Sequence, residues 1–164
     1  MINIRLAKES DLTTVERLAR EIWPVAYEGN VPPQQLAYML DLIYNNAALR
    51  DQLLNQHHTF LLVEQNGNPV GFASFSTVAP GIGKLHKLYV HQSTQGQGLG
   101  KLLVEHIIAQ LKSQSFHTLR LNVNRYNKAR FFYEKLGFVI QKEEDIDIGN
   151  GYYMIDFVME RKLM

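Results

Sequence analysis

The 164-residue chain contains no cysteine, which excludes a disulfide, a thiolate metal site and a cysteine nucleophile. It also lacks a long hydrophobic run, because stretches such as residues 60–63 are far shorter than the roughly 20 residues that cross a bilayer. The N-terminus, where Asn3 and Arg5 interrupt the apolar residues, is unlike a secretory signal. We therefore expect a cytoplasmic protein in a reducing compartment, with no membrane partner.

An excess of charge is absent as well. Seventeen Lys and Arg residues against sixteen Asp and Glu residues leave a formal net charge of +1. Overall charge gives no reason to expect a nucleic-acid partner, and an anionic ligand would need a local binding device. The adjacent His57 and His58 have no carboxylates or further histidines at metal-ligand spacing, so we expect a solvated loop here and no metal site.

The length fits one domain over residues 1–164, and the hydrophobic pattern changes between the periods of strands and helices. The expected strands are 2–6, 59–64, 70–78, 85–90, 118–123, 138–148 and 152–161, and the expected helices are 11–22, 32–43, 99–111 and 127–136. Residues 45–58 predict either a weak third helix or a loop. Hairpin strands followed by strand–helix–strand crossovers indicate an α/β fold, in which a mixed sheet carries helices on both faces.

Residues 95–101 form a glycine-rich loop between a predicted strand and a strongly amphipathic helix. Backbone N–H groups at a helix N-terminus point outward without partners, and glycine lets phosphate oxygens approach them closely. Leu102 stands where a Walker loop needs Ser or Thr, and Lys101 stands where a dinucleotide-binding fingerprint needs its third glycine. The loop is thus a phosphate-binding candidate of another kind, or a glycine-rich turn that only begins the helix.

Three segments together resemble the GNAT N-acetyltransferase superfamily. The series Gln95-x-x-Gly98-x-Gly100 matches its phosphate-binding motif, and residues 85–90 look like its fourth strand. Residues 127–138 resemble its Asn…Ala…Tyr-x-x-x-Gly-Phe segment, although the asparagine stands two residues before the alanine, where three is commoner. The resemblance implies a mostly antiparallel central sheet of about seven strands that is splayed between the fourth and the fifth.

The resemblance also implies how acetyl-CoA, as the acetyl donor, would bind. Its pyrophosphate would lie on the backbone N–H groups of the loop, which consists of Gln95, Gly96, Gln97, Gly98, Leu99, Gly100 and Lys101. The pantetheine arm would pair like an added strand with the backbone of Leu88, Tyr89 and Val90. Asn127 and Lys128 would lie along the far side of the arm.

Two side chains are candidates for the proton transfers. An alkyl ammonium with a pKa near 10.4 must lose a proton before it can attack, and a thiolate leaving group benefits from a proton donor. Tyr133 matches the acid of the family, although its place on the apolar helix face also fits ordinary core packing. His86 stands where relatives often carry glutamate and is the candidate base; the alternatives are a surface histidine without a role and a water relay. By strand alternation, one face beside the coenzyme holds Lys84, His86, Leu88 and Val90.

The amine site is expected between the first two helices and the last hairpin. Trp23 and Tyr27 are the candidate substrate-binding residues, since aromatic faces attract cations. Further candidates are Tyr38, Tyr152 and Tyr153, and acidic residues that could steer a polyamine are Glu28, Asp145 and Asp147. A faint likeness around Trp23 and Tyr38 to the bacterial polyamine (spermidine/spermine) acetyltransferase branch favours such an acceptor.

The resemblance therefore implies an acetyl-CoA-dependent N-acetyltransferase. The acetyl group would pass to a primary amine of a small molecule or peptide by direct attack in a ternary complex. The alternative is a non-catalytic acyl-CoA-binding or regulatory module on the same fold, with an unrelated nucleotide-binding domain as the third reading. The sequence leaves a homodimer open.

Overall fold

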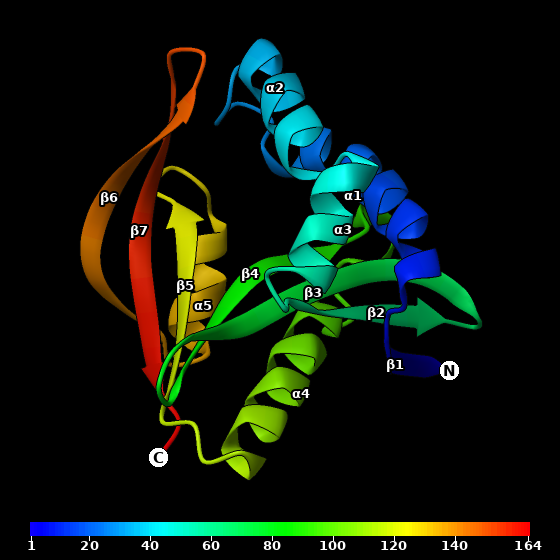
Figure 1. The fold of residues 1–164 in the computed structure, drawn as a ribbon, viewed down its shortest axis with the longest axis vertical. Coiled ribbons are helices and arrows are strands. Elements are labelled where there is room, and N and C mark those ends of the chain that lie inside the picture. Colours follow the sequence, from blue (N-terminus) through cyan, green and yellow to red (C-terminus); the bar gives the residue numbers. More distant parts are fainter.

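Seven strands form one mixed sheet in the computed structural model, which describes residues 1–164 (Figure 1). Their order across the sheet is β1-β2-β3-β4-β5-β7-β6, and every neighbouring pair is antiparallel except β4 and β5. The strands are β1 (Ile2–Leu6), β2 (Thr59–Gln65), β3 (Asn68–Ala79), β4 (Ile82–Val90), β5 (Thr118–Asn124), β6 (Val139–Gly149) and β7 (Tyr152–Lys162). The mixed, mostly antiparallel sheet that the sequence predicts is confirmed.

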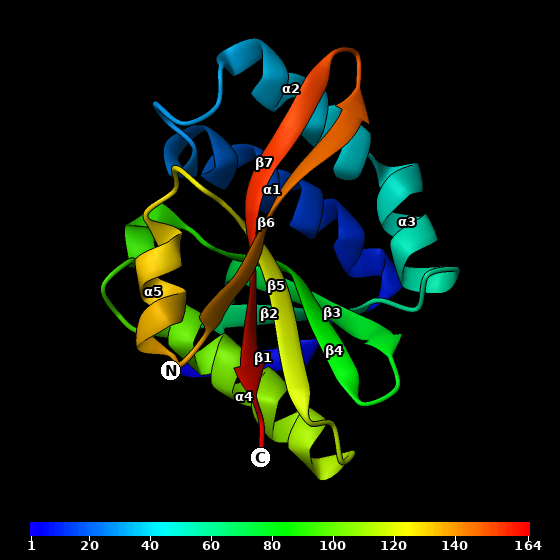
Figure 2. The same ribbon diagram turned by 90° about the vertical axis from the view of Figure 1, so that its left-hand side faces the viewer.

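Helices cover both faces of the sheet (Figures 1 and 2). One face carries α1 (Leu12–Ala26), α2 (Pro33–Ile43) and α3 (Asn46–Leu54), and the other carries α4 (Leu99–Ser113) and α5 (Ala129–Lys135). Short 3-10 turns, η1 (Glu9–Asp11) and η2 (Gln92–Thr94), precede α1 and the glycine loop. Each layer has its own hydrophobic core, with Leu18 and Phe72 under α1–α3 and Leu103 and Leu121 under α4. None of the helices combines the length and the apolar character that a membrane span requires.

Two helix boundaries go beyond the sequence pattern. The segment left open as helix or loop contains α3, which begins where the Asn45 side chain accepts the N–H of Ala48 at 2.8 Å. Helix α1 continues through Pro24, although proline removes one internal hydrogen bond, and ends where the Tyr27 N–H bonds the carbonyl of Trp23 at 3.0 Å. The extension holds Trp23 and Tyr27 at the C-terminal end of a rigid helix.

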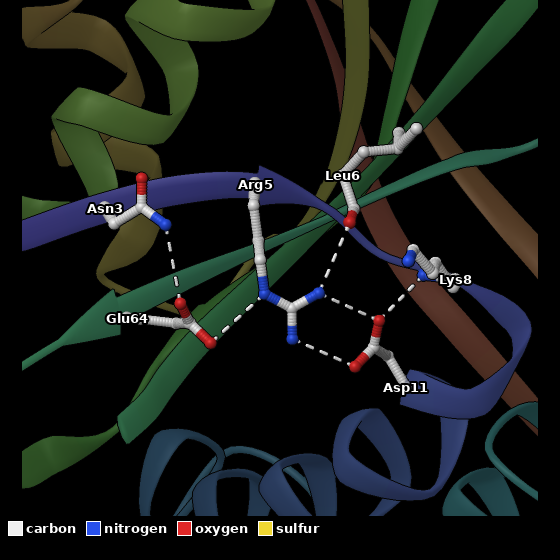
Figure 3. Close-up of polar contacts among 6 residues, drawn as sticks. All are labelled: Asn3, Arg5, Leu6, Lys8, Asp11 and Glu64. Carbon is white, nitrogen blue, oxygen red and sulfur yellow. Dashed lines mark hydrogen bonds and ion pairs between the residues drawn. The ribbon is translucent and has the colours of Figure 1, made fainter. Parts of the chain in front are cut away.

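Arg5 links β1 to the segments beside it (Figure 3). Its guanidinium donates to both carboxylate oxygens of Asp11 at 2.9 and 3.0 Å, and to Glu64 on β2 at 3.1 Å. The Asp11 carboxylate also accepts the backbone N–H of Lys8 at 2.8 Å. Hydrogen bonding to Arg5 is the main reason that the pKa of Asp11 lies below its usual value. This bidentate pair fixes the turn from β1 into α1.

The parallel pairing between β4 and β5 is short. It runs from Ile82 opposite Thr118 to Leu85 opposite Leu121, whereas β4 continues to Val90. The two strands separate beyond this point, which confirms the splay expected between the fourth and fifth strands. The backbone of residues 86–90 consequently has a strand partner on the β3 side only.

A β-bulge interrupts β4 at the same place. Lys87 lies opposite Ser74 and Leu85 lies opposite Phe75, so His86 is an extra residue in the ladder. The bulge ends the regular alternation of side chains: Leu88 packs against the core under α4, whereas His86 stacks on His58. The predicted common face for Lys84, His86, Leu88 and Val90 is therefore wrong.

Candidate active site

A cavity of about 970 Å³ opens where β4 and β5 separate. Its walls come from α1, α2, β4, the start of α4, β5, α5 and the β6–β7 hairpin. Of the residues predicted to be catalytic, to bind the coenzyme or, like Trp23 and Tyr27, to bind the substrate, all but one line it: Trp23, Tyr27, His86, Leu88, Tyr89, Val90, Gln95, Gly96, Gly98, Leu99, Gly100, Lys101, Asn127, Lys128 and Tyr133. The exception is Gln97, whose side chain accepts a hydrogen bond from Gln65 at 2.6 Å on the exposed surface. Among the further acceptor candidates, Tyr153 lines the cavity, whereas Tyr38 and Tyr152 do not.

The glycine loop has the geometry of an anion cradle. Gly96 and Gly98 have φ angles of 83° and 75°, in the left-handed region, and nothing lies within 4 Å of the place where either Cβ would stand. The first backbone bond of α4 runs from Leu102 to the carbonyl of Gly98 at 3.0 Å, so the preceding N–H groups have no acceptor within the protein. Unpaired N–H groups and open space at a helix N-terminus suit phosphate oxygens.

Contacts around the cradle fix its position. The ring of Phe132 would come within 3.3 Å of a Cβ at Gly100, so glycine at this position lets α5 approach the start of α4. The exposed ammonium of Lys101 stands 3.8 Å from Glu105 and leaves the cradle itself open. On the other wall, the Asn127 side-chain oxygen accepts the N–H of Ala129 at 2.8 Å, which leaves the Asn127 amide nitrogen without a partner.

Tyr133 combines a packed ring with an unpartnered hydroxyl. Its ring makes edge contacts with Phe132 and Phe138, at centroid distances of 5.2 and 5.7 Å, and its residue is 9% exposed. The hydroxyl has no hydrogen-bond partner in the protein, and Tyr133 lines the cavity. Burial raises the pKa of Tyr133 well above 10, and nearby Tyr27 adds to this rise, so the phenol keeps its proton at neutral pH. The ring of Tyr133 therefore packs in the core, and the catalytic role of its free hydroxyl stays a prediction.

Trp23 and Tyr27 contribute an aromatic wall to the cavity. The Tyr27 and Tyr89 hydroxyls lie 2.8 Å apart, and the Trp23 ring packs against both of these residues at centroid distances of 4.9 and 5.5 Å. Burial, together with the negative charge of Asp156, raises the pKa of Tyr27 to about 12. The acceptor side of the cavity is therefore lined by neutral phenols near one buried carboxyl group.

His86 lies on the cavity wall in a setting that makes it a weak base. Its ring stacks on His58 at a centroid distance of 3.9 Å, and its Nε2 is 2.7 Å from the Ser76 hydroxyl. Burial, with the neighbouring His58 and Lys87, lowers the pKa of His86 to about 3. An imidazole with so low a pKa is a poor proton acceptor, and the role of His86 as the base stays a prediction. His58, expected to be solvated, is half-buried, and burial lowers its pKa to about 4.

Asp156 is a candidate residue that sequence reasoning missed. It lies on β7 opposite Asn124, is 4% exposed and lines the cavity. Its only hydrogen bond is from the Asn122 side chain at 3.3 Å. Burial raises the pKa of Asp156 above its usual value, and nearby Glu144 acts in the same direction. The signal in the sequence was a single charge within the apolar strand segment 152–159.

Lys87 is the second residue that the sequence reasoning missed. It is 7% exposed, and its Nζ donates to the Gln52 side-chain oxygen at 2.7 Å. The ammonium also lies 5.3 Å from the ring centroid of Tyr44 and 5.7 Å from that of Phe60. Burial lowers the pKa of Lys87 to about 8. A cation is thus buried in the same cavity wall without any carboxylate partner.

The remaining acceptor-side residues hold the cavity together. The Tyr38 hydroxyl donates to the carbonyl of Ile148 at 2.7 Å, and the Gln35 amide donates to the carbonyl of Tyr153 at 2.9 Å. The Tyr38 ring also packs on Tyr152 at 5.3 Å. These contacts, called the hairpin clamp below, join α2 to the β6–β7 hairpin, and both views show the two side by side (Figures 1 and 2).

The acidic residues proposed to steer a polyamine do not line the cavity. Asp145 pairs with Arg125, and the Asp147 side chain accepts the N–H of Gly149 at 2.8 Å. Glu28 is exposed in the turn after α1. No group of three or more His, Asp and Glu side chains is arranged to hold a metal ion.

Residues 28–161 match the family described as the acetyltransferase (GNAT) domain. The chain belongs to this family. Its fold and its cavity at the divergence of β4 and β5 agree with that membership.

The similar proteins include acetyltransferases that are named for different acceptors. The chain is 38% identical to the ribosomal protein bS18-alanine N-acetyltransferase of Haemophilus influenzae over 101 residues. This alignment covers 60% of this chain and 65% of that enzyme. It is 28% identical to the spermidine N(1)-acetyltransferase of Thermoplasma acidophilum over 98% of this chain and 97% of that enzyme. The crystal structure of the PaiA N-acetyltransferase of the same organism, in complex with coenzyme A, superposes with a TM-score of 0.83 at 27% identity and 99% coverage of both chains.

The cradle gives a first prediction. Gly98→Asp would place a side chain and a negative charge in the open space beside the free N–H groups, so calorimetry should show a loss of coenzyme A affinity of at least about tenfold. Gly151→Asp is the matched control, because Gly151 has a φ of 77° with equally open surroundings on the β6–β7 hairpin. Equal affinities in the two folded variants would remove the cradle assignment.

Lys87 gives a second prediction, on stability. Its pKa of about 8 lies below the usual 10.5, so the folded protein holds this proton less tightly than the unfolded chain. The wild type should therefore gain up to about 3 kcal/mol relative to Lys87→Met as the pH rises from 7 to 10.5. Urea unfolding of both proteins across this range measures the change. A flat difference for Lys87→Met would contradict the buried charge.

Proposed function

We propose that this protein transfers an acetyl group from acetyl-CoA to a primary amine of a small molecule or peptide, by direct attack in a ternary complex. The observation that carries the proposal is that the phosphate cradle of α4 and the free Tyr133 hydroxyl face one cavity at the split between β4 and β5. Release of free coenzyme A thiol with a panel of amines is the direct test.

The coenzyme would occupy the half of the cavity between β4 and α5. The free N–H groups from residue 98 onward would take the pyrophosphate, and the unpaired edge of β4 at Leu88 and Val90 would hydrogen-bond the amides of the pantetheine arm. The free amide nitrogen of Asn127 faces this same space. Support comes from a family relative of 27% identity that was solved with coenzyme A.

The acceptor must reach the site as a free amine. At pH 7 an ammonium with a pKa near 10.4 costs roughly 4–5 kcal/mol to deprotonate, so a proton acceptor inside the site lowers the barrier. Asp156 fits this role better than His86. Its carboxylate lines the acceptor side, can bind the ammonium directly and has a pKa above its usual value, whereas His86, with a pKa of about 3, has little tendency to take a proton.

Acetyl-CoA supplies the acetyl group as a thioester. As the thioester bond breaks, negative charge develops on sulfur. Tyr133, which matches the acid of the family motif, would donate its proton to this sulfur. Burial raises the pKa of Tyr133, so the phenol keeps its proton until a strong base forms beside it. Tyr133 therefore remains a hydrogen-bond donor while the amine approaches. The edge contacts with Phe132 and Phe138 hold the Tyr133 ring in place.

The alternative, a non-catalytic acyl-CoA-binding or regulatory module, explains the cradle alone. It gives no reason for an unpartnered phenol and a buried carboxyl group on the same cavity, since burying such polar groups costs free energy. We therefore retain the transferase proposal. Cytoplasmic location, the single-domain extent over residues 1–164 and a homodimer stay predictions.

The role of Tyr133 predicts a separation between stability and rate. Tyr133→Phe keeps the packed ring and removes a hydroxyl that has no partner in the protein, so the free energy of unfolding should change by less than about 1 kcal/mol. Turnover at saturating coenzyme should fall by about 10²–10⁴-fold. Phe138→Leu is the opposite control, since it should lower stability more than turnover. Full turnover in Tyr133→Phe would leave Tyr133 as a core residue only.

The choice between Asp156 and His86 predicts a difference in the pH profile. If Asp156 takes the proton, kcat/KM of the wild type should fall as the pH drops through the raised pKa of this carboxyl group, because the acid form cannot accept it. In Asp156→Asn this limb of the pH profile should disappear and the rate should fall by about 10²–10⁴-fold. In His86→Gln the limb should remain. A limb that disappears only in His86→Gln would reverse the assignment, and one that survives both changes would favour a water relay.

A further inference from the structure

Lys87 is a buried charge that the transfer reaction does not use. It lies at 7% exposure on the cavity wall, beyond the bulge at His86 and on the side covered by α1–α3. An ammonium has three hydrogens to donate, and the Gln52 oxygen at 2.7 Å takes one of them. Lys87 is not part of any ion pair in the protein. The buried cation is therefore only partly satisfied.

The surroundings of Lys87 offer little else to neutralise it. The Tyr44 and Phe60 rings lie at 5.3 and 5.7 Å, and they attract the cation without accepting a proper hydrogen bond. Burial, with a smaller effect of the Lys87 charge, lowers the pKa of His58 to about 4 and that of His86 to about 3, so both imidazoles are neutral at pH 7 and do not repel the lysine. An unbalanced positive charge in a dry wall attracts an anion more strongly than the same charge on the surface.

Other polar groups near Lys87 also lack hydrogen-bond partners. Three buried atoms of cavity-lining residues lack a hydrogen-bond partner, namely Trp23 Nε1, Tyr44 Oη and His58 Nδ1, and a fourth such atom, Ser74 Oγ, lies on β3 opposite Lys87. All three residues line the same cavity as Lys87. Buried polar groups are usually paired, so the part of the protein around Lys87 is poor in internal hydrogen bonds and offers the cation no further acceptor.

We propose that Lys87, with Gln52 beside it, forms a subsite for a carboxylate, and that the acceptor is a small amino acid-like molecule that carries a carboxylate as well as a primary amine. This inference rests on the proposed function. The opposite charge lies on β7, where Asp156 can take the ammonium while Lys87 on β4 takes the carboxylate. Such a pair of charges disfavours a polyamine, because the buried ammonium of Lys87 repels a second cationic group.

Matched acceptors isolate the carboxylate. Ornithine and putrescine have the same two amines at the same spacing and differ only in the carboxylate, and lysine and lysinamide differ in its charge alone. In the wild type, kcat/KM should be higher for ornithine than for putrescine and higher for lysine than for lysinamide. Lys87→Met should lower the ornithine-to-putrescine ratio by about 10- to 100-fold, the weight of a hydrogen bond to a charged group.

Two further variants complete the test. Lys112→Met removes an exposed lysine in the last turn of α4, at the opposite end of this helix from the glycine loop, and should leave both rates unchanged. Gln52→Leu should lower the ratio in the same direction and serves if Lys87→Met does not fold. Wild-type preference for putrescine, or an equal loss for both acceptors in Lys87→Met, would overturn the subsite while the transferase proposal stands.

Failure of the proposed function has a different signature. If no amine in the panel releases thiol, the transferase proposal fails, and calorimetry of ornithine and putrescine with the coenzyme A complex still decides the subsite. Ornithine binding that is tighter than putrescine binding in the wild type, and that weakens in Lys87→Met, supports it. Equal binding of the two ligands overturns it.

Discussion

The end of the β4–β5 pairing after Leu85 is the constraint on which the rest of the structure depends. A parallel pair in the middle of a sheet is normally covered by helices and closed along its length. Here the two strands part, and the gap exposes an unpaired backbone edge that faces the N-terminus of α4 and the side chains of α5. The cradle, the Tyr133 hydroxyl and the acceptor wall are neighbours only because this one ladder is interrupted.

The bulge at His86 adds a second consequence to that interruption. One extra residue in β4 shifts the side-chain alternation, so Lys87 and Tyr89 face the layer of α1–α3 while Leu88 faces the core under α4. The coenzyme side of the strand thus remains apolar, and the acceptor side gains a charge. With Asp156 on β7, two buried groups of opposite charge lie on one cavity in a protein whose net charge is only +1. Local placement rather than overall composition sets the electrostatics of the site.

Features that depend on a short stretch of chain could be predicted from the sequence. The glycine loop, the amphipathic helix after it and the asparagine–tyrosine segment each carry their own spacing, and the order of elements indicated the mixed sheet. All predicted coenzyme residues except Gln97 line the cavity. The bulge could not be predicted, because it arises from the register between β3 and β4. Burial of Lys87, Asp156 and His86 likewise depends on which distant segments cover them, so their shifted pKa values have no signature in a local pattern.

The hairpin clamp joins residues more than a hundred positions apart in the chain, since Gln35 and Tyr38 on α2 bond to carbonyls of the last hairpin. It closes the acceptor side without touching the loop of α4 or the open edge of β4. The two halves of the cavity are therefore built from separate sets of contacts. In evolutionary terms this division is a form of modularity: exchanges in α2 and the hairpin tip can change the amine that is accepted, while the half that holds the acetyl donor keeps its geometry.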